Sequence, residues 1–112
     1  MNFDDIKSRF DEIKNGQTYT LSHGVKGAIV GVLDKACGSK ENRYQFAIAL
    51  GCSPHSKDWT QGEWWAMSKI VKVDKPFGKW QATNEKFDQI IGAVMAKIGN
   101  NENQISMFEV NA

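Results

Sequence analysis

The adjacent residues Gly38 and Ser39 constrain the fold more than any other feature of this sequence. Glycine readily takes the left-handed conformation that ends a helix, and serine is a strong residue at the position that begins one. Apolar residues recur at helical spacing on both sides of this pair. Helices that end and begin at neighbouring residues must pack as neighbours. The sequence therefore predicts helices over about 23–37, capped by Ser22, and about 40–50, ended by Gly51, as an antiparallel pair or a helix-turn-helix.

Three further segments show helical apolar spacing between cap residues. The clearest begins at Thr60-Gln61-Gly62-Glu63, which fits a capping box and predicts a helix that ends before Asp74. The other two are predicted from Asp4 or Asp5 to about Lys14, and from Thr83 or Asn84 to about Ile98, with Gly99 as the stop. Segments 17–21 and 74–82 are predicted to be connections. The expected fold is mainly α, a compact bundle of about five short helices over 1–99 with a flexible C-terminal tail over 100–112.

Composition supports a single soluble domain. The chain has 112 residues, of which 41% are hydrophobic and 24% are charged, and its formal net charge is only +1. No apolar run reaches the length of a membrane span. The first residues lack the basic and apolar regions of an export signal, so we expect a cytoplasmic protein without a membrane partner.

The segment 23–37 is unusually rich in glycine. Gly24, Gly27 and Gly31 each weaken a helix by up to about 1 kcal/mol relative to alanine, so packing must hold it. Its apolar residues cover most of the circumference, which predicts a central helix surrounded by others. The spacing of Gly27 and Gly31 also leaves a flat strip that the backbone of another helix could approach. A phosphate-binding glycine loop is not favoured, because no Gly-Lys-Ser/Thr sequence follows.

Few residues are suited to catalysis or metal binding. Cys37, Cys52, His23 and His55 are of the types that bind zinc, but only Cys52 and His55 are closely spaced, whereas a structural site usually has two such pairs. We expect both cysteines to be reduced and buried. Carboxylates are spread along polar faces without an acid–base pair. We therefore predict no catalytic residues, no metal, no cofactor and no enzymatic activity.

The last dozen residues contain the apolar pentapeptide Gln104-Ile105-Ser106-Met107-Phe108 within a polar tail. Such a tail has too little apolar surface to fold alone, so the pentapeptide is typical of a segment that docks on a partner. It resembles the bacterial sliding-clamp-binding motif. The resemblance implies that Gln104 occupies a polar subsite and that Ile105, Met107 and Phe108 enter an apolar pocket on the clamp. The alternative is that these side chains fold back onto the body.

A second candidate site is basic and aromatic. Four lysines and a tryptophan lie close together in the sequence, shortly after the adjacent Trp64 and Trp65: Lys69, Lys72, Lys75, Lys79 and Trp80. Lysines can meet phosphates while bases stack on aromatic rings, so this cluster predicts contact with single-stranded nucleic acid. The alternative is a solvated helix end followed by a loop with core aromatics. In a helix-turn-helix, Lys40, Asn42, Arg43 and Gln45 would be placed to read DNA; otherwise they form a solvent face.

The helix ends and caps of 43–51 and 56–63 also resemble helix-loop-helix segments of phage-encoded recombination and replication accessory proteins. Together the resemblances imply a non-enzymatic accessory protein of DNA replication or recombination that docks on the sliding clamp, or on another protein, through its tail. Two alternatives stay open. One is an inhibitor of a host defence or nucleic-acid-processing complex, encoded by a phage or plasmid. The other is a small single-stranded DNA-binding protein.

Overall fold

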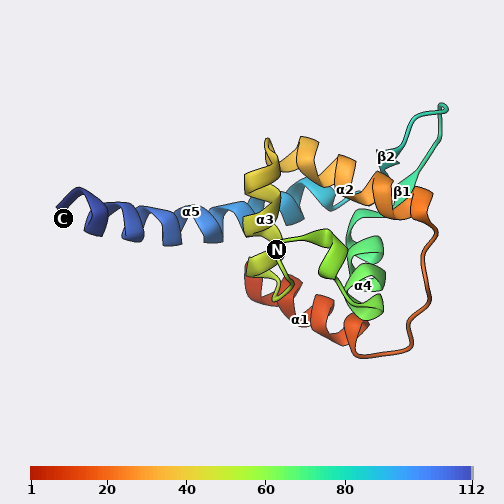
Figure 1. Cartoon of the computed structure of the whole chain (residues 1–112), viewed down its shortest axis with the longest axis horizontal. Coiled ribbons are helices and arrows are strands. Elements are labelled where there is room, and N and C mark those ends of the chain that lie inside the picture. Colours follow the sequence, from red (N-terminus) through yellow and green to blue (C-terminus); the bar gives the residue numbers. More distant parts are fainter. Residues whose placement is uncertain (112) are drawn as a thin grey trace.

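The protein is a mainly helical bundle, as the sequence predicts (Figure 1). A computed structural model describes the backbone of residues 1–111 and the side chains of residues 1–99. Its elements, in chain order, are α1 (Phe3–Lys14), α2 (His23–Cys37), α3 (Lys40–Ala49), a 3₁₀ turn η1 (Ser56–Asp58), α4 (Gln61–Val71), β1 (Val73–Asp74), β2 (Gln81–Ala82) and α5 (Phe87–Asn111). No described helix is long and apolar enough to cross a membrane.

The starts of α2, α3 and α4 follow the predicted caps. The side chains of Ser22 and Ser39 accept hydrogen bonds from the amides of the third residues that follow them, and Gly38 ends α2 at φ 95°. The capping box of α4 forms in both directions between Thr60 and Glu63. At α1 the predicted cap is wrong by two or three residues, because the Asn2 side chain accepts from the Asp5 amide and leaves Asp4 and Asp5 inside the first turn.

The core fills the space between the five α-helices. Its fully enclosed side chains come from α1 to α5 and the loop after α3, and they include Phe10, Ile29, Phe46, Leu50, Met67 and Val94. Trp59, at the end of the loop after α3, is also buried and donates its indole N–H to the Ser53 carbonyl at 2.7 Å. Its ring meets the edge of Trp64 at 4.7 Å between centroids. The loop after α3 is thereby fixed to α4.

The predicted central position of α2 is confirmed only in part, because α2 packs against α3, α4, α5 and both strands but one of its sides is open. Its buried residues are Ala28, Ile29, Leu33 and Cys37, which lie on one side. On the other side Gly24, Gly27 and Gly31 are exposed, and a Cβ atom added at any of them would meet no heavy atom within 4 Å. No described helix therefore packs against the glycine strip. The high apolar content of α2 therefore does not bury its whole circumference, because the glycines on the open side have no side chain to pack against a neighbour.

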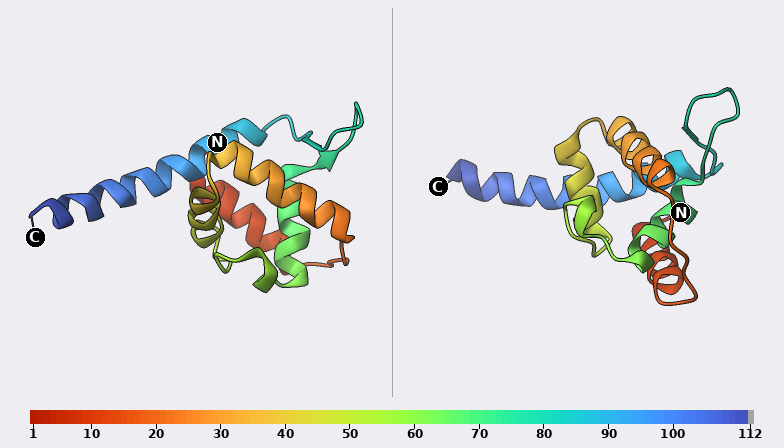
Figure 2. Two further views of the ribbon diagram at one scale, coloured as in Figure 1. Left: turned by 45° about the horizontal axis from the view of Figure 1, so that its top comes forward. Right: turned by 45° about the vertical axis from the view of Figure 1, so that its right-hand side comes forward.

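The segment between α4 and α5 differs most from prediction. Helix α4 ends at Val71, and Lys72 takes a left-handed conformation with φ 51°. Val73 and Asp74 then pair antiparallel with Ala82 and Gln81, so the predicted loop is a short hairpin. It extends from the bundle in Figures 1 and 2.

Helix α5 starts later and ends later than predicted. Thr83 and Asn84 do not begin it, because both bond to carbonyl groups at the end of α4: Thr83 to Lys72, and the Asn84 side chain to Ile70 at 2.7 Å. The helix then continues past Gly99 to Asn111. Gly99 is not among the glycines with positive φ, so it lacks the left-handed conformation that would stop a helix.

Candidate functional site

The clamp-like pentapeptide lies in the part of α5 that leaves the bundle. Ile90, Ile91, Val94 and Ile98 anchor α5 to the core. Beyond them the ribbon extends away from the other helices in all views (Figures 1 and 2). The side chains of Gln104, Ile105, Ser106, Met107 and Phe108 lie outside the described residues.

The structure divides the predicted lysine cluster into two groups. Lys69 and Lys72 lie at the end of α4. Lys75 and Lys79 lie in the β1–β2 hairpin with Trp80, and the Lys75 ammonium is 4.4 Å from the centroid of the Trp80 ring. The two groups therefore belong to different surfaces.

The hairpin presents two exposed aromatic rings. Phe77 at its tip is 85% exposed, and Trp80 is 36% exposed. Trp80 also lines a shallow hollow of about 420 Å³ together with Gly27 and Gly31 of α2. The open glycine strip and the hairpin are thus parts of one surface, which the sequence did not connect.

The start of α3 is not arranged as a DNA-reading helix. Arg43 is buried, and its guanidinium binds the Asp34 carboxylate of α2. The Asn42 side chain donates to the Cys37 carbonyl at 2.9 Å. These two residues therefore hold the α2–α3 turn together, which leaves Lys40 and Gln45 as the exposed members of the predicted set.

Both cysteines are free and buried, as predicted. Burial raises the pKa of the Cys37 thiol to about 11 and that of Cys52 to about 12. Both thiols are therefore protonated at neutral pH and are poor nucleophiles. His23 and His55 are exposed, and His55 packs against the edge of the Tyr44 ring. Among the described residues, no three His, Cys, Asp or Glu side chains are grouped as metal ligands.

No family model, curated protein or solved structure matches this chain. The pentapeptide and the surfaces of the bundle are the features of this chain that point to a function.

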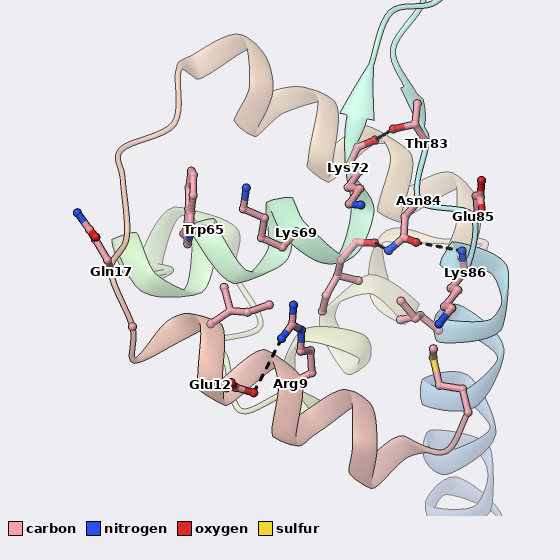
Figure 3. Close-up of a pocket in the computed structure, with 15 residues that line it drawn as sticks. Arg9, Glu12, Gln17, Trp65, Lys69, Lys72, Thr83, Asn84, Glu85 and Lys86 are labelled. Atoms are coloured by element: carbon pink, nitrogen blue, oxygen red, sulfur yellow. Dashed lines mark hydrogen bonds and ion pairs between the residues drawn. The ribbon is translucent and has the colours of Figure 1, made fainter.

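A larger groove lies where α1, α4 and the start of α5 meet (Figure 3). It has a volume of about 1120 Å³, and its lining is polar and apolar in nearly equal parts. Its charged and aromatic lining consists of Arg9, Glu12, Trp65, Lys69, Lys72, Glu85 and Lys86. The sequence placed only Lys69 and Lys72 of these residues in a candidate site, because Arg9, Glu12, Glu85 and Lys86 come from other parts of the chain. The pairing of Trp65 with Lys69 at i, i+4 was the one local signal for it.

Proposed function

We propose that the protein is a non-enzymatic accessory factor of DNA replication or recombination that docks on the bacterial sliding clamp through residues 104–108. The match of Gln104, Ile105, Met107 and Phe108 to the clamp-binding pattern carries the proposal. A cytoplasmic location is part of it, since the clamp works on chromosomal DNA.

The position of the pentapeptide supports this proposal. Among the side chains that the structure describes, Ile98 is the last core residue of α5, and the five residues after it are Gly99-Asn100-Asn101-Glu102-Asn103, none of which is a large apolar residue. At 1.5 Å per residue, Gln104 begins about 9 Å along the helix axis from Ile98. A polar spacer thus separates the apolar residues that hold α5 in the bundle from those proposed to enter the clamp.

The test is a titration of purified clamp with the full-length protein and two variants. Phe108→Ala should weaken binding by at least about 2 kcal/mol, roughly 30-fold, if this ring is the anchor of the interface. Val110→Ala removes a nearby apolar side chain outside the pentapeptide and should bind as the wild type does. Equal affinity of the wild type and Phe108→Ala would refute the proposal. So would a loss of affinity in Val110→Ala as large as the loss in Phe108→Ala.

A further inference from the structure

The groove between α1, α4 and the start of α5 has an excess of positive charge. Arg9, Lys69, Lys72 and Lys86 line it, against the carboxylates of Glu12 and Glu85 (Figure 3). Arg9 and Glu12 approach to 4.0 Å, but both side chains are more than 70% exposed, so this pair neutralises little charge. Within the described residues Lys69, Lys72 and Lys86 form no ion pair. These three ammonium groups are therefore available to an anionic ligand.

An aromatic ring stands beside these cations. Trp65 is half-buried, and the edge contact with Tyr19, at 5.1 Å between ring centroids, fixes its orientation. The Lys69 ammonium lies 4.2 Å from the centroid of the Trp65 ring. A cation against a partly exposed indole is the combination that binds a phosphate and stacks an adjacent base.

Lys72 occupies a backbone position that glycine would fill at lower cost. It is the only described residue other than glycine with positive φ; Gly38, Gly51 and Gly78 take the other such positions. A left-handed conformation costs a lysine roughly 1 kcal/mol relative to glycine. Strained positions of this kind persist where the surrounding structure holds them, and they cluster at functional sites. At this position the lysine adds an ammonium group to the groove, which glycine would not.

Hydrogen bonds fix the backbone around Lys72. The Lys72 carbonyl accepts from the Thr83 amide at 2.8 Å and from the Thr83 hydroxyl. The Asn84 side chain joins the Ile70 carbonyl to the Lys86 amide, at 2.7 and 3.0 Å. The segments that carry Lys72 and Lys86 are therefore held together before any ligand arrives.

We propose that this groove binds single-stranded nucleic acid, with Lys69, Lys72, Lys86 and Arg9 at phosphates and Trp65 against a base. A groove of about 1120 Å³ lined by six charged side chains differs from the enclosed apolar pockets of small ligands. Its four cationic side chains suit the successive phosphates of a strand. The site lies on the bundle and includes no residue of the pentapeptide, so it is independent of clamp docking.

The test measures binding of a fluorescent oligothymidylate of about 12 nucleotides by anisotropy, with the full chain and a series of salt concentrations. Lys72→Gly removes one ammonium group and relieves the left-handed strain. We expect it to weaken binding several-fold and to reduce the slope of log affinity against log salt by about 0.7, the value for one phosphate contact on a single strand. The same variant should be at least as stable as the wild type. Loss of binding would then not be a folding defect.

Two further variants complete the design. Lys57→Gly removes an exposed lysine in η1, outside the groove, and should leave affinity and salt slope unchanged. Trp65→Leu should weaken binding by at least about 5-fold through lost stacking. An unchanged salt slope in Lys72→Gly would overturn the proposal. So would equal losses in Lys57→Gly and Lys72→Gly, tighter binding of duplex than of single strand, or binding of an acidic peptide but of no oligonucleotide.

Discussion

Replacing Gly62 by alanine should destabilise the protein, although alanine is the better helix former. Gly62 lies in the first turn of α4 and faces the end of α1. A Cβ atom at this position would lie 2.6 Å from the Lys14 carbonyl oxygen and 3.2 Å from the Lys14 Cγ. The closer atom belongs to the backbone, so a rotamer change cannot relieve the clash. The two helices must move apart where they are packed against each other.

The size of the effect follows from two opposing terms. Overpacking at a close contact costs typically 1–3 kcal/mol, and alanine in place of glycine contributes at most about 1 kcal/mol to a helix. The smaller term is reduced further in the first turn of a helix. We therefore expect a net loss of about 1–2 kcal/mol in the free energy of unfolding, which lowers the Tm by about 4 °C or more.

Gly27→Ala is the matched control for this experiment. Gly27 is also helical, but a Cβ atom added to it meets no heavy atom within 4 Å. Only the propensity term remains, so this variant should gain about 0.5–1 kcal/mol. Urea denaturation followed by circular dichroism measures both variants. If Gly62→Ala were as stable as Gly27→Ala, the close approach of α1 and α4 would be refuted.

Two further predictions concern the cysteines and the cap of α4. Folding raises the pKa of Cys37 from 9.0 to about 11 and that of Cys52 from 9.0 to about 12. As pH rises above 9, the thiols therefore ionise in the unfolded protein before they do so in the folded protein. The free energy of unfolding should fall as pH rises from 9 toward 11. The urea midpoint should fall less across this pH range in the variant with both cysteines replaced by alanine. If the midpoints of the variant and the wild type fell equally with pH, the two thiols would not be the cause. Thr60→Ala removes the hydroxyl that accepts from the Glu63 amide at 3.1 Å and should cost about 1 kcal/mol by the same denaturation assay. The control Thr18→Ala removes an exposed hydroxyl that accepts a hydrogen bond from Gln61, and it should change the free energy of unfolding by less than about 0.5 kcal/mol. Equal losses in Thr18→Ala and Thr60→Ala would exclude a special role for the cap.

Local signals predicted the starts of α2, α3 and α4 well, but not those of α1 and α5. Ser22, Ser39 and Thr60 act within three residues of their own position, so the sequence alone contains the whole interaction. The stop at Gly99 was wrong because a glycine ends a helix only when it turns left-handed, and that depends on the residues that follow. The hairpin was missed because each strand has only two residues, too few for an alternating pattern.

The groove required the fold. Arg9 precedes Trp65 by more than fifty residues, and Lys86 follows the hairpin, so no spacing in the sequence relates them. The lysine cluster was visible because its members are close in sequence, yet the turn at Lys72 sends Lys75 and Lys79 to another surface. Sequence proximity thus identified the type of chemistry and not the residues that share a site.

Lys72 and the glycines of α2 show how stability measurements can separate fold from function. Lys72 has a left-handed backbone conformation, in which glycine would be more stable than lysine. Gly24, Gly27 and Gly31 lie in a helix with open space beside them, where alanine would be more stable than glycine. Neither choice improves folding, so Lys72→Gly and Gly27→Ala should both be at least as stable as the wild type. Only Lys72→Gly should lose oligonucleotide affinity, because Gly27 lies on the surface shared with Trp80 and not in the groove. If the two variants changed binding equally, a general change in stability or dynamics would explain the loss, and the specific role of Lys72 would be refuted.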